Sequence, residues 1–263
     1  MMVKEIITLF CNELGNMRGH FLETFGRLQS SLSDDDALST LDCLVEGRLL
    51  LQAQELKLNF YGEETVKAGI AFVRQHRYTL LADPLDATDN YLRGIPAFAV
   101  ALGVYDEELE KTAGGIVYSP LTDQLFVGII GRGAYCIIRE HTFPLSVSSV
   151  DCLADARLHI TSINSLEKAG VFDGGMELMR QTKNTRVLGC SSYELALVAT
   201  GGVDVTVKSS GSPWSIIPGT AIVEAAGGKV TDITGNPITR KSTSAIATNG
   251  YLHETVLGLL HGQ

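Results

Sequence analysis

The sequence lacks the features that mark several large classes of protein. It has five cysteines, an odd number, and no Cys-x-x-Cys pair. A zinc site or a disulfide framework is therefore not expected, and reduced thiols in the cytosol fit better. No apolar run is long enough to span a bilayer, and the N-terminal apolar segment is interrupted by Lys4, Glu5 and Glu13, unlike a signal peptide. We therefore expect a cytoplasmic protein with no membrane partner.

Positive charge is also scarce. The 263 residues include 21 Lys and Arg against 30 Asp and Glu, which gives a formal net charge of -9. This balance argues against a nucleic acid polymer as partner, but an acidic protein can still act on a small anion when metal cations bridge the two. The 45% hydrophobic content suits a sizeable core, and the length allows one large domain or two tightly joined subdomains.

The stretch from Tyr78 to Tyr91 carries the strongest functional signal. An apolar run leads into two carboxylates, Asp83 and Asp86, with a proline between them, and small and hydroxyl residues then begin a helix. Carboxylates are hard oxygen ligands that suit Mg²⁺. The start of a helix offers free N–H groups and a favourable dipole to an anion. The pattern therefore predicts a divalent metal held beside a phosphate.

Two acidic positions upstream of this stretch are further candidate site residues. A short strand in 59–65 runs into Gly62-Glu63-Glu64, and Asp42 lies early in a helix predicted for 38–56. Alone, the glutamates would form a solvated turn and Asp42 would be a surface or first-turn charge. Only one further element separates Glu63 from the Asp83 motif, and this raises Glu63 above the reading of a solvated turn.

Periodicity predicts a mostly antiparallel sheet in the first half and alternating helices and strands in the second. The polar run 30–36 is predicted as a loop, and the mixed stretch 142–157 as a subdomain junction. Two serines at 191 and 192 are a plausible N-cap. Other helices are expected at 3–29, 174–182, 191–200, 214–226 and 252–260. Strands are expected at 97–104, 114–118, 124–130, 133–138, 158–161, 185–188, 203–207, 229–232 and 245–247.

Four blocks occur in a characteristic order: Asp42 in Ser-Thr-Leu-Asp, Gly-Glu-Glu-Thr from 62, Asp-Pro-Leu-Asp-Ala-Thr from 83, and the segment 214–228 with its terminal Gly-Gly. Together they resemble the inositol monophosphatase family, part of the metal-dependent, lithium-sensitive phosphatases that include fructose-1,6-bisphosphatases and 3'-phosphoadenosine phosphatases. The resemblance covers roughly residues 5–260. It implies a layered α+β, α/β fold, the αβαβα sandwich of sugar phosphatases. It also implies a homodimer, with a metal-bearing α+β subdomain at 1–144 and an α/β subdomain at 145–263.

The resemblance also implies a set of metal ligands. Glu63, Asp83 and the Leu85 carbonyl would hold a first Mg²⁺, and Asp83 and Asp86 would share a second. Two or three Mg²⁺ ions are expected, with Li⁺ as an inhibitor.

The same resemblance assigns the water and the phosphate. Thr88, with Glu63 and Asp42, would orient and deprotonate a metal-held water, and the N–H groups of Ala87 and Thr88 would hold the phosphate. Mg²⁺ lowers the pKa of bound water and neutralises phosphate charge, so no covalent intermediate is needed.

Several positions depart from the family pattern, Cys190 among them. The family signature W-D-x-A-[AGP]-G begins here as Trp214-Ser215, so the expected metal-binding Asp is a serine. A hydroxyl is a poorer Mg²⁺ ligand than a carboxylate, and we expect a weakened second site. Lys208 stands where an acid often contacts sugar hydroxyls. It either favours a further anionic group on the substrate or is an exposed loop lysine. Ser191 either contacts substrate through its N–H or only caps its helix.

These observations leave alternatives open. The first is a Mg²⁺-dependent phosphomonoesterase acting on a small phosphorylated metabolite, similar to inositol monophosphate, or a sugar bisphosphate or a nucleotide phosphate. The second is a catalytically impaired relative, with Ser215 in place of the metal ligand, that binds a phosphorylated ligand or a partner protein. A calcium-binding role for Asp34-Asp35-Asp36 is a third, although the run lacks EF-hand spacing.

Overall fold

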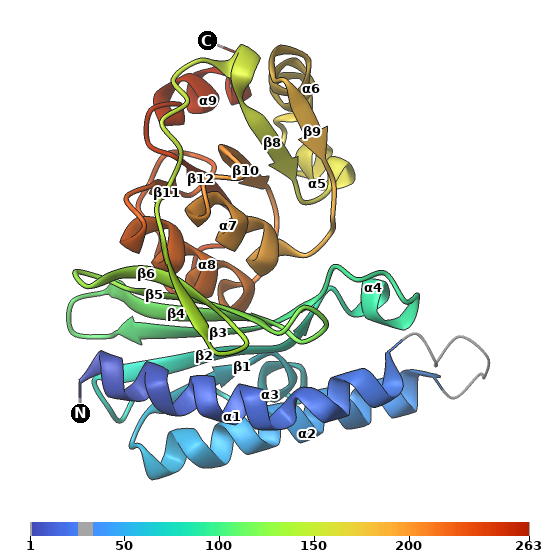
Figure 1. Cartoon of the computed structure of the whole chain (residues 1–263), viewed down its shortest axis with the longest axis vertical. Coiled ribbons are helices and arrows are strands. Elements are labelled where there is room, and N and C mark those ends of the chain that lie inside the picture. Colours follow the sequence, from blue (N-terminus) through green and yellow to red (C-terminus); the bar gives the residue numbers. More distant parts are fainter. Residues whose placement is uncertain (1, 26–33, 263) are drawn as a thin grey trace.

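The chain folds into five alternating layers of helix and sheet (Figure 1). The computed structural model describes residues 2–25 and 34–262. Helices α1 (Val3–Thr24) and α2 (Asp34–Glu55) form the first layer and cover one face of a seven-stranded sheet. Helices α7 (Ser191–Ala199) and α8 (Pro213–Ala225) lie between this sheet and a five-stranded sheet. The last layer holds α5 (Ile163–Lys168), α6 (Phe172–Gln181) and α9 (His253–Leu260). The predicted αβαβα sandwich is confirmed.

The two helices of the first layer differ in detail from the prediction. Helix α1 buries Ile6, Phe10, Leu14, Met17 and Phe21 against the sheet, whereas Leu9 is 39% exposed. It ends at Thr24, and residues 26–29 of the predicted helix lie outside the described part of the chain. The loop predicted for 30–36 is wrong where it can be compared, because α2 already begins at Asp34. The side chains of the three aspartates lie outside the described part.

The seven strands of the first sheet follow one another in chain order. Strands β1 (Asn59–Gly62) and β2 (Tyr78–Asp86) are parallel, and every later pair is antiparallel. The predicted antiparallel meander is confirmed. The remaining strands are β3 (Ala99–Asp106), β4 (Lys111–Ser119), β5 (Gln124–Ile129), β6 (Gly133–Ile138) and β7 (His141–Leu145). Strand β7 corrects the junction predicted from residue 142: nearly all of it is exposed, so it shows no alternation of apolar and polar residues.

The second sheet has the order β11-β12-β10-β8-β9. Strand β8 is parallel to β9 and β10, whereas β12 is antiparallel to β10 and β11. Helix α5 was not predicted, because six residues are too few to show a helical period. The strands are β8 (Arg157–Ile160), β9 (Asn184–Arg186), β10 (Val205–Lys208), β11 (Lys229–Thr231) and β12 (Ala245–Thr248), and a 3₁₀ turn spans Leu153–Asp155.

Helix α8 packs unusually close to the first sheet because glycines line the strands beneath it. An added Cβ at Gly115 would lie 2.2 Å from the Pro218 carbonyl oxygen, and one at Gly128 would lie 2.4 Å from the Ile222 Cα. A Cβ at Gly103 would lie 2.7 Å from Ile217. These approaches leave no room for a side chain. They fix α8, and with it the helix start that carries Trp214 and Ser215.

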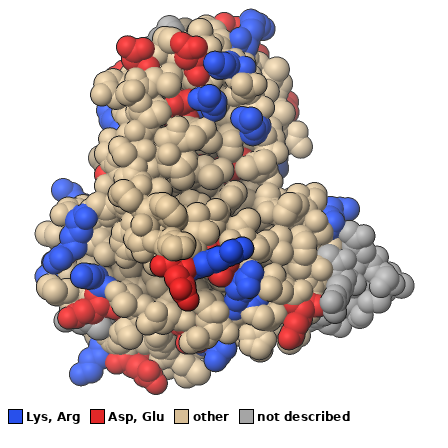
Figure 2. Space-filling model, in the orientation of Figure 1, with Lys and Arg blue, Asp and Glu red and all other residues tan. Residues whose placement is uncertain are grey.

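Basic and acidic side chains both occur on the face shown in Figure 2, and most of that face is neither basic nor acidic. Within residues 2–25 and 34–262, every helix is too short or too polar to cross a membrane.

Candidate metal and phosphate site

The register of β1 against β2 brings the two central acids together. Gly62 ends β1 and pairs with Ala82 in this parallel pair, so Glu63, the residue after β1, lies beside Asp83 of β2. Helix α3 (Glu63–Lys67) begins at Glu63. The carboxyl ends of parallel strands gather side chains at one edge. The expected partnership of Glu63 with Asp83 thus has a structural cause.

Asp83 is the most buried acid of this group, with 3% of its surface exposed. Burial raises its pKa well above the ordinary value, and the nearby charges of Asp86 and Glu63 raise it further, while the Lys208 ammonium opposes the rise. Its Oδ1 atom is buried and has no hydrogen-bond partner among the described residues. A buried carboxylate oxygen left without a donor is costly unless a cation takes it.

Helix α2 adds two further acids, one turn apart. Asp42 is 6% exposed, and burial, followed by the charges of Glu64 and Glu63, raises its pKa to about 7. Glu46, which the sequence analysis missed, accepts the backbone N–H groups of Glu64 at 2.8 Å and Thr65 at 2.6 Å. It therefore caps α3 from another helix. Its position four residues after Asp42, on the same helix face, was the available signal.

The end of β2 is shaped by a bulge. Asp83 pairs with Ala101 and Asp86 with Ala99, so β2 carries one residue more than β3 over this interval. Bulges bend a strand and change where its side chains point. The next residue, Ala87, has left-handed backbone angles (φ 71°, ψ 50°) and precedes α4 (Thr88–Leu92). The Thr88 hydroxyl donates to the Leu85 carbonyl at 3.0 Å. Threonine and carbonyl, both predicted site groups, are therefore in contact.

Asp86 points toward the start of α7. Its Oδ2 atom accepts hydrogen bonds from the backbone N–H and the hydroxyl of Ser192, each at 2.6 Å. The predicted serine N-cap is wrong, because the cap residue is Cys190 and makes no side-chain cap. The Asp86 carboxylate takes that role from another layer, where it also faces the positive end of the helix dipole.

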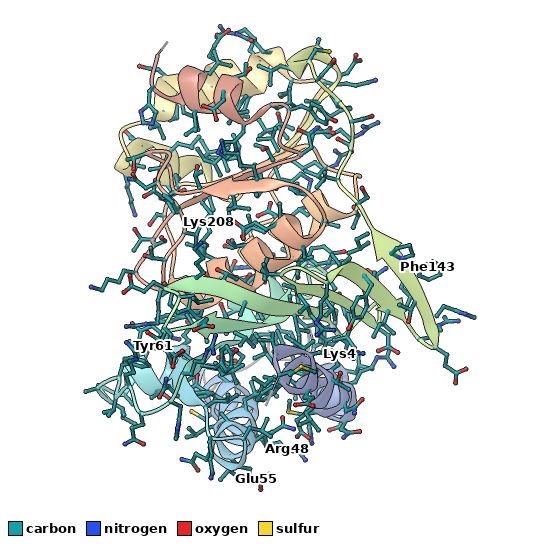
Figure 3. The ribbon with its side chains drawn as sticks, turned by 90° about the vertical axis from the view of Figure 1, so that its left-hand side faces the viewer. Lys4, Arg48, Glu55, Tyr61, Phe143 and Lys208 are labelled. Atoms are coloured by element: carbon teal, nitrogen blue, oxygen red, sulfur yellow. The ribbon has the colours of Figure 1, made fainter. Side chains whose placement is uncertain are left out.

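Lys208 ends β10 inside the molecule. Only 6% of it is exposed, and its Nζ donates to the hydroxyl of Ser191. Figure 3 shows Lys208 in the layer between the two sheets, on the same side of the molecule as Tyr61. The alternative of an exposed loop lysine is therefore wrong. The side chain also packs on Gly211, where an added Cβ would lie 1.8 Å from its Cε.

Ser215 lies in the first turn of α8 and is 5% exposed. Its hydroxyl donates to the Ser212 carbonyl at 3.1 Å. Its neighbour Trp214 packs on Tyr61 of β1, with ring centroids 5.6 Å apart. Position 215 is thus oriented by the start of α8 and by the packing of Trp214 on β1, but it supplies a neutral hydroxyl that is already bonded.

The Glu63 side chain, 24% exposed, pairs with an exposed lysine. Lys67 Nζ lies 2.9 Å from its Oε1 and 2.7 Å from Oε1 of Glu64, and the lysine side chain is 58% exposed. Among the described residues, no three His, Cys, Asp or Glu side chains form a ready-made metal centre. The oxygen donors nevertheless fit a hard cation, since Asp83 keeps an unpartnered buried oxygen and Lys67 is free to turn into solvent.

Comparisons with known proteins identify the family of this chain. The model of the inositol monophosphatase family matches residues 16–263. The chain belongs to the inositol monophosphatase family. It is 32% identical over 207 residues to inositol monophosphatase 3 of Solanum lycopersicum, covering 77% of this chain and 75% of that protein. It is 30% identical over 247 residues to fructose-1,6-bisphosphatase of Pyrococcus furiosus, covering 89% and 88%.

A solved relative supports the fold alone. The structure of inositol monophosphatase II from Staphylococcus aureus MSSA476 superimposes with a TM-score of 0.82 at 22% identity, covering 100% of this chain and 95% of that chain. Against the inositol monophosphatase pattern, this member keeps Glu63, Asp83, Asp86 and Thr88 but has Ser215 and a buried Lys208. The departures lie on the second-sheet side of the site, where α8 begins and β10 ends.

Proposed function

We propose that this member of the inositol monophosphatase family is a Mg²⁺-dependent phosphomonoesterase that acts on a small phosphorylated metabolite. One observation carries the proposal: the pairing of Gly62 with Ala82 sets Glu63 beside Asp83, whose Oδ1 is buried without a partner. The start of α4 follows the end of β2 after a single residue, and its N–H groups can meet an anion. A hard cation and a phosphate therefore suit neighbouring parts of one site.

Glu63, Asp83 and the Leu85 carbonyl would hold a first Mg²⁺, and Asp83 and Asp86 would form a second position that Ser215 weakens. When bound, Mg²⁺ lowers the pKa of a coordinated water and neutralises phosphate charge. Glu63 must give up its ion pair with Lys67 when it binds the cation. The loss of free energy is small because the lysine is exposed. The Leu85 carbonyl already accepts the Thr88 hydroxyl and keeps a second lone pair.

The remaining residues position water and phosphate. Thr88, with Glu63 and Asp42, would orient the attacking water and take its proton. Asp42 suits this part because it is buried against Glu63 and Glu64, with a pKa raised to about 7 by burial first. The N–H groups of Ala87 and Thr88 would hold the phosphate. No protein nucleophile is required, so no cysteine or histidine is assigned a catalytic part.

Ser191 and Lys208 would face the substrate from the second-sheet side. The fructose bisphosphatase and inositol monophosphatase relatives differ in their named substrates, and a buried ammonium favours an anionic group.

We also propose subdomains at 1–144 and 145–263, because the chain leaves the first sheet after Leu145. Homodimer formation, inhibition by Li⁺ and a cytoplasmic location stay predictions.

The test is phosphate release from a panel that includes inositol monophosphate, fructose bisphosphate and a nucleotide 3'-phosphate, with Mg²⁺ or Mn²⁺. We expect metal-dependent release from at least one of them and near-total loss in Asp83→Asn. Asp89→Asn is the matched control, because Asp89 lies in α4 with a side chain 73% exposed. Activity that survives Asp83→Asn undiminished would overturn the proposal.

Ser215 favours a second candidate, a relative that binds a phosphorylated ligand or a partner protein without useful turnover. The supporting observation is its buried hydroxyl, which already donates to the Ser212 carbonyl and brings no charge. Ser215→Asp separates the two candidates. A large gain in rate or metal affinity would support impairment, whereas good activity in the wild type with no gain would contradict it.

A further inference from the structure

Lys208 carries a buried positive charge that the metal chemistry proposed above does not use. Its Nζ donates to Ser191, and an ammonium has three donors. Within the described ranges, Nζ takes part in no ion pair at 4.0 Å or less. A charge this buried is stable only when nearby carboxylates offset the cost of removing it from water.

Helix α7 links Lys208 to Asp86. Its first two residues are neighbours, and the first, Ser191, bonds the lysine while the second, Ser192, bonds the carboxylate. The ammonium also acts on Asp83, where it opposes the rise in pKa that burial, Asp86 and Glu63 cause. Lys208 therefore faces the Asp83–Asp86 end of the acid group.

Two lysines thus serve opposite ends of the site, and they differ in how freely they can leave. Lys67 pairs with Glu63 and Glu64 but is 58% exposed, and such exposed pairs contribute about 0–1 kcal/mol. Lys208 is 6% exposed and packs on Gly211, so it has no solvent to turn into. An entering divalent ion can displace Lys67 but not Lys208.

We infer that Lys208 is the resident cation of the Asp83–Asp86 end, so that the chain holds a divalent ion at the Glu63–Asp83 end and uses the ammonium in place of a second one. This inference rests on the proposed function. The charges agree with it: a carboxylate at 215 with a divalent ion would carry one net positive charge, and Ser215 with the Lys208 ammonium carries the same. A second ion beside Lys208 would face direct repulsion.

The test counts bound ions on the full-length chain by equilibrium dialysis with Mn²⁺ in the presence of inorganic phosphate. Electron paramagnetic resonance of the same samples detects spin coupling between two Mn²⁺ ions, since paired metal sites lie about 3.5–4 Å apart. The variants are Lys208→Met, Ser215→Asp and the two combined. Lys208→Arg conserves the charge, and Lys229→Met removes an exposed lysine elsewhere.

We expect one uncoupled Mn²⁺ per chain in the wild type, Lys208→Arg and Lys229→Met, and two coupled ions in the double variant. Two coupled ions in the wild type would overturn the inference, and so would a folded double variant that still binds one. If the lysine variants do not fold, the wild-type count decides alone. Phosphate release by a chain with two ions would leave the proposed function standing, whereas a chain with neither metal nor release would contradict that function itself.

Discussion

The Asp86 carboxylate and Ser192 join the two halves of the site. Asp86 ends β2 in the first sheet, and its Oδ2 accepts both the N–H and the hydroxyl of Ser192 in α7, 106 residues further along the chain. Both side chains are buried. Hydrogen bonds to a charged group are stronger than those between neutral groups. This pair therefore fixes the second-sheet side of the site against the metal side.

Ser192→Ala removes the hydroxyl donor and leaves the N–H in place. We expect the free energy of unfolding to fall by about 1.5–3 kcal/mol, because the lost bond is to a buried carboxylate. Urea denaturation measures the loss. The control is Ser244→Ala, whose hydroxyl accepts the neutral Ile233 N–H at 3.1 Å and should cost about 1 kcal/mol. Equal losses in the two variants would show that the bond to the Asp86 carboxylate stabilises the chain no more than a bond between neutral groups.

Asp83→Asn should stabilise the metal-free chain and abolish stabilisation by Mg²⁺. Asp83 is buried beside Asp86 and Glu63, so removing its charge relieves both desolvation and repulsion. We therefore expect the free energy of unfolding to rise when a chelator is present. Mg²⁺ at 100 times its dissociation constant should stabilise the wild type by about 2.7 kcal/mol.

Thermal denaturation with chelator and with Mg²⁺ separates these two effects, and Asp89→Asn serves as control because Asp89 is exposed. We expect the control to respond to Mg²⁺ as the wild type does. An equal Mg²⁺ shift in Asp83→Asn and the wild type would mean that the ion binds elsewhere.

Lys67→Met should tighten metal binding. The lysine occupies Oε1 of Glu63 at 2.9 Å in the metal-free chain, and its removal spares the entering ion that competition. An exposed pair contributes about 0–1 kcal/mol, so we expect the dissociation constant for Mg²⁺ to fall by about 2–5-fold. Calorimetric titration gives the constant. Lys229→Met, which breaks an exposed pair with Glu254, should leave it unchanged. Weaker binding in Lys67→Met would show that the lysine assists the ion.

Sequence patterns predicted the layers and the acidic motif because both are local. The helical stripe of α1 and the strands of the meander are regular repeats, and Asp83 and Asp86 lie in one short segment. The patterns failed where a distant partner decides the outcome. The start of α7 has two serines, yet Asp86 supplies the cap. The sequence left open whether Lys208 is exposed or faces the substrate, because it does not show what covers the end of β10.

The same limit applies to Glu46 and to β7. Glu46 caps α3 from the separate helix α2, and only the fold shows which N–H groups it meets. Strand β7 pairs along its whole length with β6 but keeps its side chains exposed, so pairing occurs without the alternation that marks a strand. Non-local contacts, rather than errors in propensity, account for these differences.

His253 should make the chain less stable in acid. It is fully buried between the hydroxyls of Thr231 and Thr248, at 3.0 Å from each ring nitrogen, and burial, with the charge of Lys229, lowers its pKa from 6.5 to about 4. Between these values the unfolded chain binds the proton and the folded chain does not. The stability that this histidine contributes is therefore complete above about pH 6.5 and falls as the pH drops toward 4.

At pH 5 this loss amounts to about 2 kcal/mol. His253→Gln removes the titrating group, so its free energy of unfolding should fall by about 2 kcal/mol less than that of the wild type between pH 7 and pH 5. The glutamine variant is expected to be less stable at pH 7, because its amide cannot reproduce both threonine bonds. Urea denaturation at the two pH values measures the difference, with the exposed His141→Gln as control. Parallel losses in His253→Gln and the wild type would show that His253 takes up its proton in the folded chain as readily as in the unfolded one.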